Sequence, residues 1–304
     1  MYKHPAIDYL RYLPTLFCPG CGIGIIMHAR IEAVKELGIP REKLVNVSGI
    51  GCSGRIPQHI LTDGVHTVHG RAIAVATAIK LARPDLYVTV RTGDGDNLAI
   101  GGNHFIHAAR RNIDLLVIMV NNRNYGMTGG QLAPTTPHGA STTTTPYGNL
   151  EDPFNAVKLA ASAGATYVAR RTVAHFIQLK NSIKKGLSRK GFSFIEVISP
   201  CTSRFIRRNK ANYKDFFNDL RMKSEIKYHI DPSEAVIDRD PKTRRFKKII
   251  VGEFVEIDRP SYVERYEEYR KRAMEEKKKR SGTDPLIIFQ AKRLLIIAQK
   301  ITRA

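Results

Sequence analysis

Two apolar runs, each ending in polar residues, constrain the fold of this sequence more than any other feature. Residues 86–90 (LYVTV) and 115–120 (LLVIMV) have the β-branched, apolar character of buried strands. The motif GDGD (93–96) follows the first run and the pair NN (121–122) follows the second. A spacing of about thirty residues is typical of one strand–helix–strand unit, whose parallel strands end side by side. Ligands of open α/β sheets bind at these carboxyl ends.

The polar side chains at the two strand ends suit magnesium. Asp94 offers a carboxylate and Asn122 an amide oxygen. Zinc prefers nitrogen and sulfur, whereas Mg²⁺ takes a few protein oxygens and completes its shell with phosphate and water. Each motif by itself is also compatible with an ordinary turn. The strand before each motif favours a joint site, so the pattern predicts a diphosphate held through Mg²⁺.

Alternating strand and helix patterns predict a doubly wound, mainly parallel α/β domain over residues 1–204. The expected strands are 44–47, 65–68, 86–90, 115–120, 166–168 and 192–198, of which the last two close the sheet. The expected helices are 23–37, 71–82, 154–163 and 173–185. Residues 135–147 (TTPHGASTTTTPY) form a long polar loop, and loops of this length are often functional.

Residues 205–304 have a different character and are expected to form a charged extension. Residues 262–280 predict a highly charged helix, and residues 286–301 (LIIFQAKRLLIIAQKI) predict an apolar-rich one. An apolar helix face must be buried. We therefore expect the extension to pack on the domain or on a partner subunit.

The composition limits the cellular setting and the classes of partner. The formal net charge of +21 suits nucleic acid, an acidic protein or anionic small molecules. No apolar run reaches the ~18 residues of a membrane span, and the N-terminal residues lack the apolar segment of a signal peptide. These features predict a cytoplasmic protein without a membrane anchor. Abundant Lys, Arg and Glu without Trp is compatible with a thermophilic source.

The chain has four cysteines, Cys18, Cys21, Cys52 and Cys201. In a cytosolic protein this number favours metal ligation over disulfides. Four thiolates suit either Zn²⁺ or a [4Fe-4S] cluster, and a thioredoxin-like redox pair or unconnected core cysteines are further alternatives. Glycines beside the first three would let peptide N–H groups approach the sulfur atoms.

The pairing of GDG with a later Asn resembles the thiamine-diphosphate motif of thiamine enzymes. This resemblance implies Mg²⁺ ligands from Asp94, the Asn122 side chain and the main-chain carbonyl of Asn124. Together with CPGCG, GIGC, HGRA and YGMTGGQ, the sequence resembles the β subunit of archaeal 2-oxoacid:ferredoxin oxidoreductases over about residues 10–205. That family implies one [4Fe-4S] cluster on all four cysteines, with Cys52 beside the cofactor.

The resemblance also implies a set of residues around thiamine diphosphate. They are Ile50, Gly51, Cys52, Ser53, His69, Gly93, Asp94, Gly95, Asp96, Asn122, Tyr125, Gly126, Met127 and Thr128. A role at the start of a helix is an alternative for His69 and Arg71. Arg55 is a candidate for the substrate carboxylate, with an ordinary surface arginine as the alternative. Met127 would make the substrate pocket roomier and its 2-oxoacid range broader, unless it only fills the core.

In this family, a 2-oxoacid is decarboxylated on thiamine, electrons leave through the cluster to ferredoxin, and coenzyme A takes the acyl group. The glutamate that activates the cofactor lies on a pyrimidine-binding domain that residues 1–204 lack. The resemblance therefore implies a larger α subunit, or a fused γ-α subunit, as partner in a heterodimer. Ferredoxins are usually acidic, which suits the basic charge here.

Two other functions account for part of the sequence. Half of a non-redox thiamine enzyme would share the magnesium motif and could carry a structural four-cysteine zinc site. A nucleic-acid-binding protein with structural zinc would suit the charge and the cysteines, but it leaves the pairing of GDG with NN unexplained.

Overall fold

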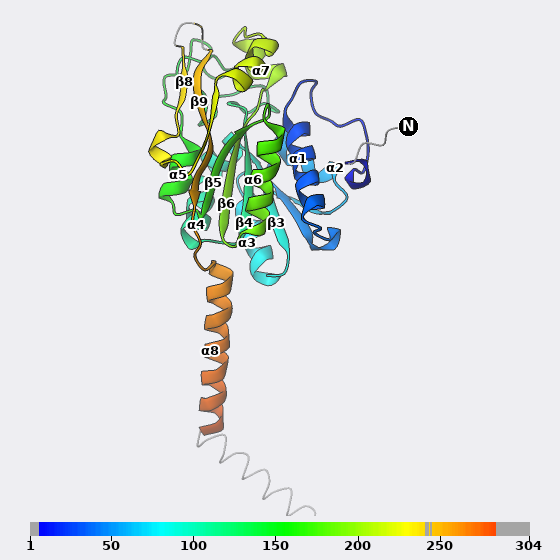
Figure 1. Cartoon of the computed structure of the whole chain (residues 1–304), viewed down its shortest axis with the longest axis vertical. Coiled ribbons are helices and arrows are strands. Elements are labelled where there is room, and N and C mark those ends of the chain that lie inside the picture. Colours follow the sequence, from blue (N-terminus) through cyan, green and yellow to red (C-terminus); the bar gives the residue numbers. More distant parts are fainter. Residues whose placement is uncertain (1–5, 241–242, 244, 284–304) are drawn as a thin grey trace, which may run out of the picture. The chain divides into compact units, whose positions relative to one another are not determined.

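The computed structural model describes residues 6–240, 243 and 245–283, and in this part of the chain nine strands form one sheet (Figure 1). The strand order is β2-β1-β3-β4-β6-β5-β9-β7, and β8 pairs with β9. The strands are β1 Leu44–Ser48, β2 Asp63–His66, β3 Tyr87–Gly93, β4 Leu115–Asn121, β5 Tyr167–Thr172, β6 Phe192–Ile198, β7 Ser224–Tyr228, β8 Ile237–Arg239 and β9 Phe246–Glu256. The α-helices are α1 Ile23–Glu36, α2 Ile56–His59, α3 Ala72–Ala82, α4 Gly102–Arg111, α5 Ala156–Ser162, α6 Phe176–Ser188, α7 Tyr213–Met222 and α8 Tyr262–Thr283.

The first six strands are parallel, as the sequence predicts. β4 and β6 are buried along their whole length because helices cover both faces of the sheet. α1 and α6 pack on one face, and α3, α4 and α5 lie on the other (Figure 1). On the second face, the ring of Phe105 in α4 packs edge-on against Phe192 and Phe194, alternate residues of β6. The prediction of a doubly wound, mainly parallel sheet is confirmed.

The expectation that residues 192–198 form the last strand is wrong. β9 joins the sheet antiparallel to β5, and β7 and β8 pair with β9. Residues up to Ser261 consequently belong to one compact unit with the rest of the sheet, so the extension from residue 205 to this point packs on the domain. The pairing of β5 with β9 joins residues more than 80 positions apart, a separation at which local sequence patterns carry little information.

Smaller differences concern strand ends. β2 begins at Asp63 rather than at residue 65, and all four of its residues are exposed. β5 extends to Thr172 because its parallel pairing with β6 continues to that residue, whereas its pairing with β9 ends at Arg170. Residues 135–147 contain no helix or strand, as expected of a long loop.

The charged helix expected over residues 262–280 is present as α8, a unit of its own. Within it, the rings of Tyr262 and Tyr266 stack, and Arg270 pairs with Glu267 at 2.7 Å. The apolar helix expected over residues 286–301 lies outside the described residues. No helix in the described ranges is both long enough and apolar enough to cross a membrane.

The sheet topology places the candidate site. The chain leaves β1 toward β2 on one side, and β3 lies on the other side of β1. Such a reversal opens a crevice between the carboxyl ends of β1 and β3. Parallel pairing brings the ends of β4 and β6 to the same edge, so residues that follow four different strands meet there.

Candidate functional site

A cavity of about 70 Å³ lies at the carboxyl ends of β1, β3 and β4. It is lined by every residue expected around thiamine diphosphate and also by Asn124. These residues come from the loop after β1, from His69, from the GDGD motif and from the segment after β4. The structure therefore brings the expected residues together, while their contact with a cofactor stays a prediction.

Asp94 is fixed by three hydrogen bonds. Its Oδ1 accepts from the N–H of Gly95 at 3.0 Å, and its Oδ2 accepts from the N–H of Arg123 at 2.7 Å and from the Thr135 hydroxyl. Burial raises the pKa of this carboxyl to about 6, although the hydrogen bonds oppose the shift. A carboxylate has about four lone-pair positions, so one remains for a cation.

The two asparagines of the NN pair have different surroundings. Asn122 lines the cavity, and within the described ranges its Oδ1 accepts a single long bond, of 3.4 Å, from the N–H of Asn124. The Oδ1 of Asn124 is buried and has no donor in the described part of the chain. Asn121 instead donates to Glu196 at 2.6 Å. The donor set at Asp94, Asn122 and Asn124 consists of oxygen atoms and suits Mg²⁺.

The Asp96 carboxylate is engaged in contacts with other residues of the chain. Its Oδ1 accepts from the N–H of Gly70 at 2.8 Å and from the N–H of Ile50 at 3.2 Å, and the Nδ1 of His69 lies 2.9 Å away. The Asp96 side chain therefore ties the loops after β1 and β2 to the end of β3. Any cofactor contact by Asp96 would be additional to this structural role.

Tyr125 packs directly against the GDGD turn. Its hydroxyl donates to the carbonyl of Gly95 at 3.2 Å, and its ring lies so close that an added Cβ on Gly95 would be 2.4 Å from it. Only glycine leaves room for this approach. Arg71, the other HGRA side chain considered, contacts His104 at 2.9 Å and does not line the cavity. It directly precedes α3, but its side chain makes no capping hydrogen bond there.

A second cavity, of about 300 Å³, is lined by all four cysteines. Cys18 and Cys21 precede α1, Cys52 follows β1 and Cys201 follows β6. Cys18 is exposed, Cys21 and Cys52 are half-buried, and Cys201 is buried. Burial, with a contribution from the other three thiols, raises the pKa of Cys21 to about 12. Metal binding at these thiols would release protons.

The spacing of the sulfur atoms bears on which metal they would hold. Among the described residues, no three cysteine sulfur atoms lie within 4.8 Å of one another. Tetrahedral zinc, with Zn–S bonds of about 2.3 Å, would require sulfur atoms about 3.8 Å apart. The four cysteines therefore do not form a ready-made tetrahedral zinc site in the described structure.

The two cavities adjoin, because Cys52, Asn122, Gly126 and Met127 line both. Met127 is 43% exposed, which excludes a core-filling role. Arg55 is half-buried and lines the cysteine cavity; in the described part of the chain its guanidinium contacts only the Gln58 amide oxygen, at 3.5 Å. It is therefore not held by a carboxylate of the protein.

Sequence reasoning missed Thr135 and the Arg123 main chain as supports of Asp94. The only signal for Thr135 was its place at the start of the long polar loop. No residue pattern identifies a main-chain donor.

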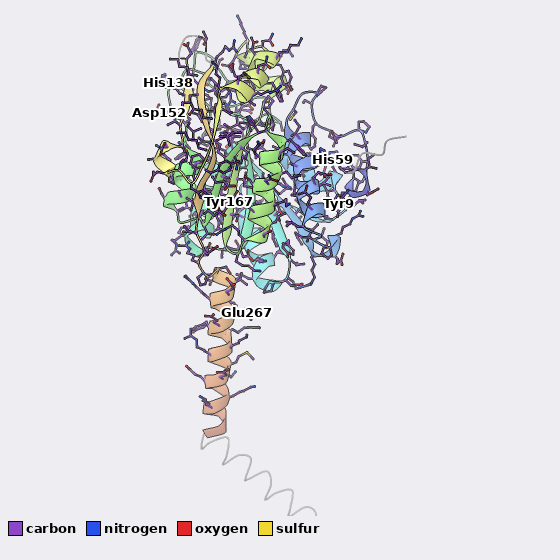
Figure 2. All side chains as sticks on the ribbon, viewed as in Figure 1. Tyr9, His59, His138, Asp152, Tyr167 and Glu267 are labelled. Atoms are coloured by element: carbon purple, nitrogen blue, oxygen red, sulfur yellow. The ribbon has the colours of Figure 1, made fainter. Side chains whose placement is uncertain are left out.

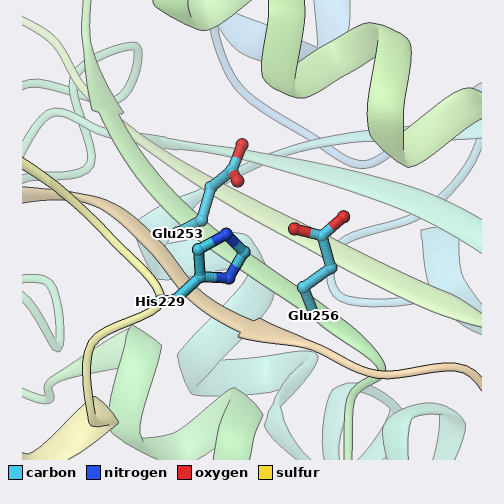
Figure 3. Close-up of side chains that lie close together, drawn as sticks. All are labelled: His229, Glu253 and Glu256. Carbon is cyan, nitrogen blue, oxygen red and sulfur yellow. The ribbon is translucent and has the colours of Figure 1, made fainter.

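A separate group of potential metal ligands is formed by His229, Glu253 and Glu256 (Figure 3). Lys185 contacts Glu253 at 2.7 Å and Glu256 at 3.1 Å. Arg171 also contacts Glu253, and Arg189 contacts Glu256. Three cations already balance the two carboxylates, so this group does not favour a metal ion.

The comparisons with known proteins agree with the site geometry. Residues 49–197 match the family described as thiamine pyrophosphate enzyme, C-terminal TPP binding domain. The 2-oxoglutarate synthase subunit KorB of Methanocaldococcus jannaschii is 51% identical over 86% of this chain and 95% of that protein. The 2-oxoacid:ferredoxin oxidoreductase subunit beta of Saccharolobus solfataricus is 44% identical over 74% of this chain and 72% of its own length.

A solved structure of the 2-oxoglutarate:ferredoxin oxidoreductase from Magnetococcus marinus, with 2-oxoglutarate, coenzyme A and succinyl-CoA bound, has a similar fold. The TM-score is 0.78 at 34% sequence identity, and the match covers 90% of this chain and 92% of that one. The cavity at the strand ends and the neighbouring cysteine cavity agree with these relatives, and the chain belongs to the family of 2-oxoacid:ferredoxin oxidoreductase β subunits.

Proposed function

We propose that this chain is the β subunit of a cytoplasmic, coenzyme A-acylating 2-oxoacid:ferredoxin oxidoreductase. It would bind thiamine diphosphate through Mg²⁺ and hold one [4Fe-4S] cluster on Cys18, Cys21, Cys52 and Cys201. Thiamine diphosphate supplies the nucleophilic carbon for decarboxylation of a 2-oxoacid, and the cluster supplies a one-electron acceptor. The products would be an acyl-CoA, CO₂ and reduced ferredoxin.

The adjoining cavities support this proposal most strongly. A cavity lined by four cysteines shares Cys52 and Met127 with the cavity at the GDGD and NN motifs. A non-redox thiamine enzyme has no need for four cysteines beside its cofactor. The sulfur spacing, wider than a zinc site requires, favours a cluster over structural zinc.

The residues would act by holding and orienting the reactants. Asp94, the Asn122 side chain and the Asn124 carbonyl would bind Mg²⁺ and so neutralise the diphosphate. Arg55 would hold the substrate carboxylate by a bidentate contact at the cavity wall. Met127 would offer an adaptable apolar wall that accepts 2-oxoacids larger than pyruvate.

We expect two partner proteins, of which one completes the active site and the other accepts its electrons. A larger α subunit, or a fused γ-α subunit, would supply the pyrimidine-binding domain and its activating glutamate. Four cysteines are enough for one cluster only, so electrons would pass directly to a separate ferredoxin. The net charge of +21 would attract an acidic ferredoxin, and high salt would slow that association.

The test is anaerobic co-purification of the chain with its α subunit, followed by metal analysis and absorption spectroscopy. We expect about four iron atoms per β chain and a broad visible band that bleaches when 2-oxoacid and coenzyme A are added. The β chain alone should show no turnover. Colourless protein loaded with zinc, or full turnover by the β chain without its partner, would overturn the proposal.

A further inference from the structure

A third cavity, of about 620 Å³, shares no lining residue with the two cavities of the proposed active site. One wall comes from the loop after β4, and another from the segment between Phe205 and Asp219. Residues of β8 and β9, including Ile237, Arg239 and Phe246, complete it. Much of the wall thus belongs to the extension after Cys201, beyond the residues that match the thiamine-binding family.

Arg123 is the central charge of this cavity. Its side chain is buried, with 4% exposed, and the guanidinium carbon lies 5.3, 4.6 and 4.8 Å from the ring centres of Phe205, Phe216 and Phe246. Its two terminal nitrogens have no hydrogen-bond acceptor among the described residues. The aromatic rings stabilise the cation in part. A buried guanidinium nevertheless requires acceptors for its five N–H groups.

Three aspartates line the cavity, and none of them accepts a hydrogen bond from the two terminal nitrogens of Arg123. The Oδ1 of Asp240 accepts from the N–H of Thr243 at 2.7 Å. Asp219 receives a two-point contact from Arg245, at 3.0 and 2.6 Å, and Asp215 lies 3.9 Å from the same guanidinium. The nearby Arg170 has its own partner in Glu196.

Two further basic side chains line the cavity and are exposed, Lys210 and His138. Figure 2 shows His138 on the side of the domain where β8 and β9 lie. Neither side chain has a carboxylate partner in the described ranges. Among the described lining residues, basic side chains outnumber the three aspartates, so the cavity is positive overall. The rings of Phe205, Phe216 and Phe246 form its apolar wall.

We propose that this cavity binds a small organic anion, with a phosphate or carboxylate group on Arg123 and an apolar body against Phe205, Phe216 and Phe246. The rings enclose the guanidinium, so one of them must rotate away on binding, a side-chain change that is common in complexes. Lys210 and His138 attract the anion at the entrance. Since the Arg123 N–H donates to Asp94, occupancy of the cavity is coupled to the proposed magnesium site.

The test uses the complex of the full chain with its α subunit, saturated with Mg²⁺ and thiamine diphosphate so that the diphosphate site is filled. Binding of phenyl phosphate, phenylacetate, inorganic phosphate and phenol is measured by calorimetry. We expect the two probes with both an anionic group and a ring to bind at least about tenfold tighter than inorganic phosphate or phenol. The tighter of the two identifies the preferred anionic group.

Variants locate the binding. Arg123→Met should weaken binding of the tighter probe by about tenfold or more, because a charge-assisted hydrogen bond is lost. Lys223→Met, which removes an exposed lysine outside the cavity, should leave binding unchanged. Arg55→Ala should also leave it unchanged, which separates this cavity from the substrate pocket.

If Arg123→Met fails to fold, Lys210→Glu decides the question, because Lys210 is exposed and its replacement does not disturb the core. This variant should bind the probe about threefold more weakly or worse. Unchanged binding in Lys210→Glu, or no detectable binding to the wild-type complex, would overturn the proposal. Binding to the β chain that disappears in the complex would also overturn it, since a segment of the α subunit would then be the natural occupant.

Discussion

The main-chain N–H of Arg123 donates a hydrogen bond of 2.7 Å to the Oδ2 of Asp94, and this contact joins the ends of two neighbouring parallel strands. Asp94 follows β3 and Arg123 follows β4. Arg123 has a φ of 66°, a left-handed conformation that few residues other than glycine adopt. The Thr136 hydroxyl holds the Arg123 carbonyl at 2.7 Å. The proposed magnesium ligand is therefore positioned by a fixed backbone turn.

The buried Asp94 predicts a pH dependence of cofactor binding. Burial raises the pKa of Asp94 from the ordinary 3.8 to about 6, so the fold without cofactor binds this proton more tightly than the unfolded chain does. The contribution of the protonated carboxyl to folding stability is complete below pH about 4 and is lost as the pH rises to about 6. Mg²⁺ requires the carboxylate. Calorimetry should therefore show the affinity for Mg²⁺ with thiamine diphosphate falling about tenfold for each pH unit below about 6. The exposed variant Asp85→Asn should keep this profile, whereas an affinity independent of pH across this range would contradict the role of Asp94.

Arg55 is expected to act on the substrate. In Arg55→Ala the kcat/KM for the 2-oxoacid should fall by about tenfold to a hundredfold, through a higher KM, since a charged hydrogen-bonded contact is lost. Arg55→Lys should recover part of the loss, because the charge returns without the two-point geometry. Arg71→Ala, a matched change at an arginine outside both cavities, should behave as wild type. Equal kcat/KM in Arg55→Ala and wild type would dismiss the role.

Replacing Cys52 distinguishes a cluster bound by all four cysteines from a set of unconnected cysteines. Cys52→Ser should lose iron and the visible absorption band in anaerobically purified complex, because one of four thiolate ligands is removed. Ser203→Ala is the control, since Ser203 lines the same cavity and lies 3.6 Å from the sulfur of Cys18. It should retain its iron. Retention of four iron atoms by Cys52→Ser would show that Cys52 is not a ligand.

The strand-end motifs were predictable from the sequence because each lies directly after a run of buried residues. β6 was predicted with its observed bounds, and β3 and β4 differ from expectation only at their ends. Parallel pairing then made the meeting of Asp94 with Asn122 a matter of topology. Parallel pairing also brings Cys52 and Cys201 to the same edge of the sheet, because Cys52 follows β1 and Cys201 follows β6.

Contacts that depend on distant pairing were not predictable. Nothing local to residues 246–256 indicates that this charged segment forms β9 against β5. The lysines and the glycine in β9 weaken its strand pattern, and the added Cβ of residue 252 would lie 1.6 Å from the Lys227 carbonyl oxygen. The cavity between the extension and the loop after β4 depends on this pairing. The cluster of aromatic rings around Arg123 depends on it as well.

The buried ion pair between Arg170 and Glu196 predicts a large stability effect at a position away from the chemistry. The two side chains are each 1% exposed, with 2.6 Å between Nε and Oε2, and Glu196 also accepts from Asn121. Glu196→Ala would leave a buried guanidinium without its anion, which costs about 3–5 kcal/mol. Thermal melting of the purified chain should show a Tm lower by roughly 10 °C. Glu36→Ala, which removes the exposed partner of Lys180 and Lys184, is the matched control and should melt as wild type. Equal Tm values for the two variants would mean that other groups satisfy Arg170, such as the Asn155 oxygen 3.1 Å away.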